Sequence, residues 1–117
     1  MNLVDFIEAW WLSVQPIFET AGAISRFERS PIDRLNSSCA LNIRRDKQEA
    51  DLLVWASGEA EFTTIGRDGS ANQQHFDDLH TPSALGMILL RCIHVAVSSE
   101  SGELCRNLGD GGGTGLR

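Results

Sequence analysis

The sequence predicts an α+β fold: an antiparallel meander sheet of four to five strands, flanked by an N-terminal and a C-terminal helix packed on one face. Apolar residues recur at three- and four-residue spacing near both ends of the expected folded unit, as in amphipathic helices. Between them, residues 39–79 form short, partly alternating apolar runs separated by polar or glycine-containing turns. The chain has 117 residues, of which 42% are hydrophobic and 22% charged, a composition typical of one folded domain.

The first helix is expected over residues 3–21. Asn2 precedes it as an N-cap, and Gly22 is the natural residue to end it. Pro16 lacks the N–H that would bond to the carbonyl of Leu12, so the helix is expected to bend or almost end there.

Strands and a second helix follow. The strands are expected over residues 23–30, 39–44, 50–56, 59–65 and 71–79, with the last one at an edge of the sheet. Thr81 and Pro82 favour the start of a helix, because proline at the first helical position has no N–H to leave unpaired. An apolar stripe then predicts a helix to Val97.

The most informative turn is Ser57-Gly58, interpreted as a two-residue hairpin loop. That pairing places four side chains on the core face: Leu53, Trp55, Ala60 and Phe62. The opposite face would carry Leu52, Val54, Ala56, Glu59, Glu61 and Thr63. A mixed apolar and acidic patch of this kind is typical of protein–protein contacts. The predicted partner-binding residues are therefore Leu52, Val54, Glu59, Glu61 and Thr63. Asp77 and Asp78, near the end of the last expected strand, are added to them.

The formal net charge is −6, and it is unevenly distributed. Residues 49–80 carry seven acidic and one basic side chain, whereas residues 26–47 carry six basic and three acidic ones. Nucleic acids and anionic membranes are bound mainly through basic surfaces, so neither is an expected partner. The acidic hairpin region instead favours a protein partner with a basic surface.

The cysteines and the chain ends are less informative. Cys39, Cys92 and Cys105 are odd in number and far apart, which predicts neither disulfides nor a zinc site. Acidic residues stand where a signal peptide needs basic ones, and no apolar run reaches the roughly 20 residues of a membrane span. We expect a cytoplasmic protein with one domain over residues 1–97. Residues 98–117 hold six of the 11 glycines and are expected to be a flexible tail.

One cluster is chemically capable of binding a metal ion. His75, Asp77, Asp78 and His80 are all possible ligands within six residues. On a strand, however, His75 and Asp77 point to one side and Asp78 and His80 to the other. A solvated edge strand is the preferred interpretation, and no cofactor is expected. A small metal-binding protein or enzyme that uses these four residues stays an alternative.

The central stretch resembles a known family. The segments LNSSCALNIRR (35–45) and EADLLVWASGEAEF (49–62), followed by a polar strand and a closing apolar helix that begins at Thr-Pro, are similar to TriTu-type bacterial immunity proteins. The resemblance covers about Leu3 to Val97, and its main motif is V-W-x-S-G-E-A, which contains Trp55 and Gly58.

This resemblance implies a stoichiometric antitoxin without enzymatic activity. In that family the partner is an Rhs-associated polymorphic toxin, an ADP-ribosyltransferase that modifies elongation factor Tu, whose active site the antitoxin blocks. The resemblance implies structural roles for Trp55, as a core aromatic, and for Gly58, in a turn with positive φ. A monomer or a 1:1 complex is expected. The alternative of a small acidic secretion or effector chaperone is disfavoured, because such chaperones place a helix within the strand series.

Overall fold

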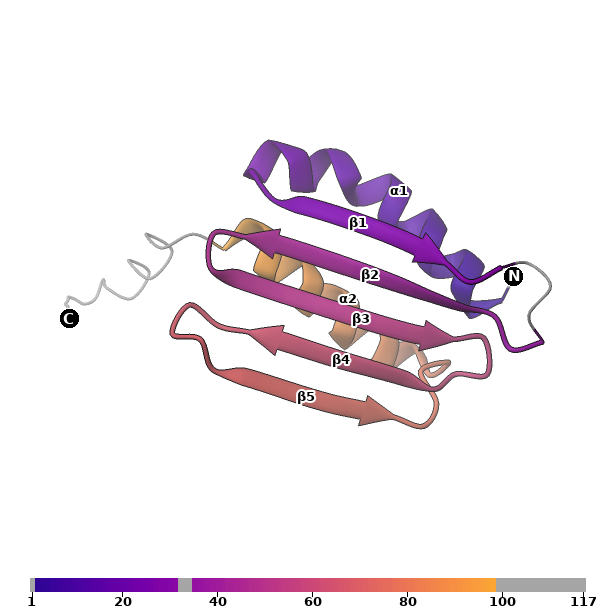
Figure 1. The fold of residues 1–117 in the computed structure, drawn as a ribbon. Helices are drawn as coiled ribbons and strands as arrows, with labels where there is room; N and C mark the ends of the chain where they lie inside the picture. Colours follow the sequence, from indigo (N-terminus) through magenta and orange to yellow (C-terminus); the bar gives the residue numbers. More distant parts are fainter. Residues whose placement is uncertain (1, 32–34, 99–117) are drawn as a thin grey trace.

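Five strands and two helices make up the described part of the chain (Figure 1). The computed structural model describes residues 2–31 and 35–98. In chain order the elements are α1 (Leu3–Ala21), β1 (Ile24–Arg29), β2 (Ser38–Arg45), β3 (Gln48–Trp55), β4 (Ala60–Ile65), β5 (Ala71–Phe76) and α2 (Pro82–Val97). The sheet order is β1-β2-β3-β4-β5 and each pair is antiparallel, so the predicted meander is confirmed. The segment expected to be a tail, 98–117, lies outside the described residues except for Ser98.

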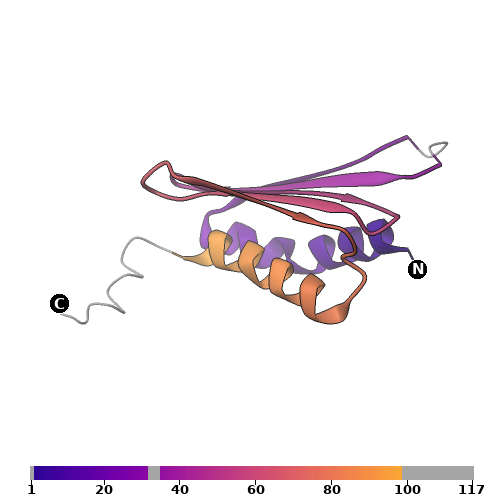
Figure 2. The same ribbon diagram turned by 90° about the horizontal axis from the view of Figure 1, so that it is seen from below.

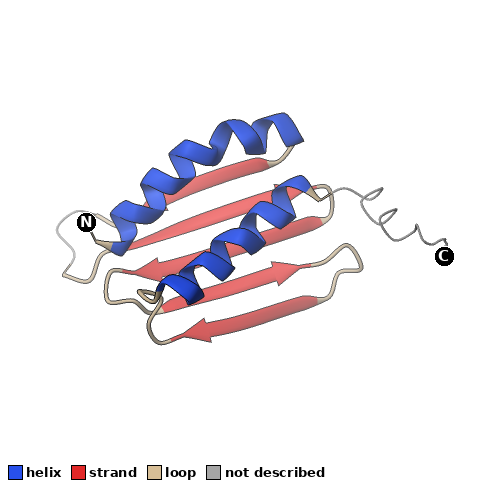
Figure 3. Ribbon diagram, turned by 180° about the vertical axis from the view of Figure 1, so that it is seen from behind, coloured by secondary structure: helices blue, strands red, loops and turns tan. Residues whose placement is uncertain are grey.

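The two helices lie on the same side of the sheet, as predicted, and leave its other side uncovered (Figure 2). They lie side by side and run in the same direction, so both N-termini are at one end of the molecule (Figure 3). The sheet therefore has a covered face, which packs against the helices, and an open face. This asymmetry decides which side chains a partner can reach.

Helix α1 has the expected bounds. Asn2 caps it, since its Oδ1 accepts a hydrogen bond from the backbone N–H of Asp5 at 2.8 Å. Gly22 ends it with a φ of 86°, a left-handed conformation that glycine adopts without strain. The helix continues through Pro16 to Ala21, so the proline does not end it.

The hydrophobic core lies between the helices and the covered face. Both helices contribute large side chains to it, among them Ile7 and Phe18 from α1 and Ile88 from α2, each fully buried. Alternate residues of the three central strands meet them: Cys39, Leu41 and Ile43 in β2, Ala50, Leu52 and Val54 in β3, and Ala60 and Phe62 in β4. The period of two along each strand is the reason one face is apolar.

One guanidinium group connects the C-terminal ends of both helices. Arg45 Nε donates to the carbonyl of Ala21 at 2.8 Å, and its Nη1 donates to the carbonyl of Ser98. Arg67 Nη2 donates to the same Ser98 carbonyl at 3.2 Å. Because the helices are parallel, their negative dipole ends lie together, and these cations compensate both.

The β3–β4 turn differs from the prediction by one residue. The backbone N–H of Trp55 donates to the carbonyl of Glu59, and the N–H of Gly58 donates to the carbonyl of Trp55, both at 2.9 Å. The loop therefore has three residues, and Val54 pairs with Ala60. The φ of Gly58 is +108°, which agrees with the expected turn glycine.

Because the loop is one residue longer than predicted, the β3 side chains expected to face the core face outward, and those expected outside face the core. Leu52 and Val54 are 1% and 0% exposed on the covered face, so their predicted place on an exposed patch was wrong. Leu53 and Trp55 lie on the open face and are half-buried, so Trp55 is not the core aromatic that was expected. The assignment of β4 was right, with Phe62 toward the core.

Candidate functional site

The open face is a five-stranded surface that no described element covers (Figure 2). It is built from the strand residues whose side chains alternate away from the helices. By register these are Ile24, Arg26 and Glu28 of β1, Ser38, Ala40, Asn42 and Arg44 of β2, Glu49, Asp51, Leu53 and Trp55 of β3, Glu61, Thr63 and Ile65 of β4, and Ala71, Gln73 and His75 of β5.

Leu53 and Trp55 form the apolar centre of the open face. Leu53 lies opposite Ala40 of β2 and Glu61 of β4, and Trp55 lies opposite Ser38. Both side chains are half-buried, although no second layer covers them. Tryptophan surrounded by polar groups is the residue type that most often dominates the energy of protein–protein contacts.

Carboxylates lie beside this centre on the β1–β3 side, together with Arg26, whose Nη2 is 3.7 Å from Glu28 Oε2. Asn42 Nδ2 donates to Glu49 Oε2 at 2.7 Å and to Asp51 Oδ1 at 3.2 Å, so one amide positions two acidic groups. Glu28 lies across the strand from Ala40. Since alanine is small, the face is hollowed there, with a volume of about 210 Å³ lined by Arg26, Glu28, Ala40, Asn42 and Asp51.

A second acidic group lies on the β4–β5 side. Glu61 Oε1 accepts from Gln73 Nε2 at 3.0 Å, and its Oε2 is 2.9 Å from His75 Nδ1. His75 Nε2 is 3.2 Å from Asp77 Oδ1, so both ring nitrogens face carboxylates. The hydrogen bond to Glu61 raises the pKa of His75 above its ordinary value. Glu61 is thus held in one orientation by two neighbours.

The structure separates the residues predicted to bind a partner. Glu61 and Thr63 belong to the open face, and Glu59 is exposed just before β4. Asp77 is exposed beyond β5 and adjoins the face through His75. Leu52 and Val54 are buried in the core, which removes them from any surface.

Asp78 lies against the β3–β4 turn. Its Oδ1 accepts from the backbone N–H of His80 at 2.9 Å and is 2.7 Å from His80 Nδ1. The backbone hydrogen bond, followed by the side-chain one, holds the pKa of Asp78 below its ordinary value. A Cβ atom on Gly58 would lie 2.7 Å from the same oxygen, so the pair packs closely on the turn. We assign Asp78 a structural contact there.

Sequence reasoning did not place Leu53 and Trp55 on the open face, and it did not name Glu28 or Asp51 as candidate site residues. The signal that identifies them is Gly58 as the third residue of a loop, because three-residue hairpin loops favour glycine at that position. With that loop length, the alternation along β3 places both apolar residues outside.

The four residues of the possible metal site do not converge, and the two described cysteines are buried. Among residues 2–31 and 35–98, no group of three or more His, Cys, Asp or Glu side chains is placed to hold a metal ion. The four residues of the predicted cluster form two pairs, His75 with Asp77 and Asp78 with His80. Cys39 and Cys92 are buried, and desolvation raises the pKa of each thiol to about 12. These thiols are therefore protonated at neutral pH and weakly nucleophilic.

In comparisons with known proteins, no family model, curated protein or solved structure matches this chain. No helix within the described residues has the length and hydrophobicity that crossing a membrane requires.

Proposed function

We propose that this chain is an immunity protein: a stoichiometric antitoxin that binds a cognate bacterial polymorphic toxin in the cytoplasm and blocks its active site. The observation that carries the proposal is the open face, an uncovered five-stranded surface that presents Leu53 and Trp55, with Asp51 and Glu61 next to Leu53. Such a surface fits a basic protein partner.

The toxin that the sequence resemblance implies has chemistry that suits this face. An ADP-ribosyltransferase binds NAD, whose diphosphate is anionic, and such groups are held by basic side chains. The carboxylates of Glu28, Glu49 and Asp51 offer the same charge to that cleft, while Leu53 and Trp55 supply apolar contact area. Binding through the open face would exclude the anionic substrate without any reaction on this chain.

The other candidate functions have less support. Secretion chaperones carry a helix within the strand series, whereas the described residues between β1 and β5 include no helix. A metal-dependent activity would need the paired residues of the β5–α2 segment to converge, and they form two separate pairs. Metal analysis of the purified protein checks the second alternative, and a stoichiometric ion would favour it.

Co-expression with the product of the adjacent gene tests the proposal. We expect protection of the host from that product and a complex that survives purification. If the adjacent product is toxic and this chain neither protects against it nor binds it, the proposed function is refuted.

A matched pair of charge reversals tests the face. Glu28 is an exposed residue of the open face, and Glu19 is an exposed residue of α1. Replacing either one by lysine changes the charge by the same amount. At low salt Glu28→Lys should slow association with the toxin by about tenfold and weaken its salt dependence, because acidic groups at an interface steer a basic partner. Glu19→Lys should leave both nearly unchanged. Equal effects of the two substitutions would place the interface elsewhere.

A further inference from the structure

Two polar side chains stand at one end of the covered face, which is otherwise apolar along β3 and β4. Gln48 lies two residues before Ala50 in β3, and Thr64 lies two residues after Phe62 in β4. Ala50 and Phe62 are buried in the core, so the period of two places Gln48 and Thr64 on the helix side of the sheet as well. Both are half-buried, and neither side chain has a hydrogen-bond partner among the described residues. The fold therefore leaves their hydrogen-bonding capacity unused.

Helix α2 adds a cation on the same side of the sheet. The guanidinium carbon of Arg91 lies 5.1 Å from the centroid of the Phe62 ring, and its Nη1 donates to Gln74 Oε1 at 2.5 Å. These two contacts hold the guanidinium in place but do not neutralise it. Within residues 2–31 and 35–98, no carboxylate oxygen lies within 4.0 Å of its nitrogen atoms. Arg91 is thus a half-buried cation without an acidic partner in that part of the chain.

His94 accompanies Arg91, because residues three apart lie on the same side of a helix. Its imidazole is exposed, and no other described residue donates to it or accepts from it. The sequence of α2, PSALGMILLRCIHVAV, contains no acidic residue. This side of α2 therefore carries positive charge and free donors, without a carboxylate of its own helix to compete for them.

A hollow of about 200 Å³ brings the four side chains together. Arg91 and His94 line it from α2, Gln48 from β3 and Thr64 from β4, and the remaining lining residues are uncharged. We name it the Arg91 hollow. Because a water molecule takes up about 30 Å³ of liquid, the hollow has room for a group of five heavy atoms. A phosphate group is of this size.

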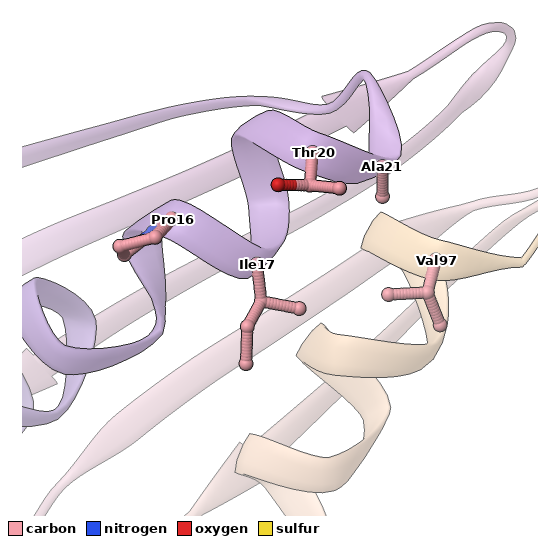
Figure 4. Close-up of a pocket in the computed structure, with 5 residues that line it drawn as sticks. All are labelled: Pro16, Ile17, Thr20, Ala21 and Val97. Carbon is pink, nitrogen blue, oxygen red and sulfur yellow. The ribbon is translucent and has the colours of Figure 1, made fainter.

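A larger hollow, of about 380 Å³, lies between α2 and the C-terminal half of α1 (Figure 4). It is lined by Pro16, Ile17, Thr20, Ala21 and Val97. Thr20 is the one polar side chain among these five residues, so the lining carries no charge and few hydrogen-bonding groups. Of the two hollows, the Arg91 hollow has the chemistry that suits a charged ligand.

We propose that the Arg91 hollow binds a phosphate group, either as inorganic phosphate or as part of a small phosphomonoester. A guanidinium donates several N–H groups to an oxyanion in a fixed geometry, and such charge-assisted hydrogen bonds are the strong ones. His94, Gln48 and Thr64 supply further donors from α2 and from two strands. A phosphate has enough oxygen atoms to accept from all four side chains, whereas a carboxylate has two.

The site is separate from the proposed toxin contact. The Arg91 hollow is on the helix side of the sheet, and the carboxylates of the open face, such as Glu49 and Glu61, point to the opposite side. An anion in the hollow is therefore kept apart from these acidic groups, although the chain has a net charge of −6. One half-buried cation with neutral donors predicts weak binding, with a dissociation constant of about 1 mM.

An NMR titration of the full chain with sodium phosphate, at constant pH and ionic strength, tests the site. The imidazole signals of His75, His80 and His94 report separately. We expect a saturable shift for His94, with a midpoint of about 1 mM. His75 and His80 should change little, because each lies beside a carboxylate that repels anions. Parallel shifts of all three signals, or no saturation at His94, overturn the proposal.

Other anions identify the chemistry of the ligand. Acetate should bind at least about fivefold more weakly than phosphate, because it offers fewer acceptor atoms and less charge. Equal affinity for acetate overturns the assignment to phosphate. Phenyl phosphate distinguishes the two sources: tighter binding than inorganic phosphate supports a phosphomonoester, and weaker binding supports the free ion.

A matched pair of arginine substitutions locates the site. Arg91→Gln should weaken phosphate binding by more than about tenfold. Arg44→Gln removes the same charge from an exposed residue of the open face and should have little effect. Equal weakening by the two substitutions would indicate a general effect of charge and overturn the proposal.

A second variant covers the case in which Arg91→Gln fails to fold, since Arg91 also packs on Phe62. Thr64→Val keeps nearly the same shape, removes one hydroxyl donor and should weaken binding by about threefold. Urea unfolding midpoints identify any variant with a damaged fold. Unchanged affinity in the folded Thr64→Val variant would count against the hollow as the binding site.

Discussion

Replacing either of two adjacent leucines in β3 by alanine should have unequal effects on stability. Leu52 is 1% exposed and packs in the core between the sheet and the helices. Leu52→Ala leaves a cavity and should lower the free energy of unfolding by about 3 kcal/mol, within the range for buried leucines. Leu53 is half-buried on the open face, where solvent fills the space, so Leu53→Ala should cost about 1 kcal/mol.

Urea unfolding followed by tryptophan fluorescence and circular dichroism measures the difference. With a denaturant slope of about 1.5 kcal/mol per molar urea, Leu52→Ala should lower the midpoint by about 2 M and Leu53→Ala by less than 1 M. The slope itself should not change. If Leu53→Ala is at least as destabilising as Leu52→Ala, the one-residue register of the β3–β4 hairpin is wrong, and so is the composition of the open face.

Three further predictions concern single sites. Gly58→Ala should destabilise by more than Gly69→Ala, since both have positive φ but only a Cβ at Gly58 would clash, and urea midpoints compare them. Arg45→Met should cost about 2 kcal/mol by removing charged hydrogen bonds to both helix ends, with faster amide exchange there as the check. The pKa of His75 is raised by Glu61, so this stabilisation is complete below the unfolded pKa of about 6.5 and is lost as the pH rises through the folded pKa. His75→Gln should abolish that pH dependence of the midpoint, and an unchanged profile would contradict it.

The sequence was sufficient to predict the helices and their common side of the sheet. In α1 the apolar spacing, the Asn2 cap and the Gly22 stop all agree, and the structure has the same bounds. At α2 the Thr81-Pro82 pair marked the start, although the Thr81 hydroxyl makes no capping hydrogen bond. Pro82 at the first helical position and the hydrogen bond from Leu85 N–H to the Thr81 carbonyl mark that helix start.

The open face was harder to predict, because β3 is apolar on both sides. Leu52, Leu53, Val54 and Trp55 are consecutive, so their order does not show which of them face the core. The choice depends on the loop, where three residues in place of two exchange the faces. In β4, by contrast, Phe62 stands between polar neighbours and its burial was predictable.

The order of the elements along the chain has a consequence for folding during synthesis. Each strand pairs with its neighbours in sequence, so hairpins can form quickly and locally. The helices that cover them stand at opposite ends of the folded unit, and residues of α2 such as Ile88 and Cys92 complete the core. Until α2 has been made, a nascent chain therefore holds an assembled sheet in which the apolar area that α2 covers is still in water. Helix α2 is the element that ends this exposure, and we expect substitutions in its core stripe to cause aggregation during synthesis.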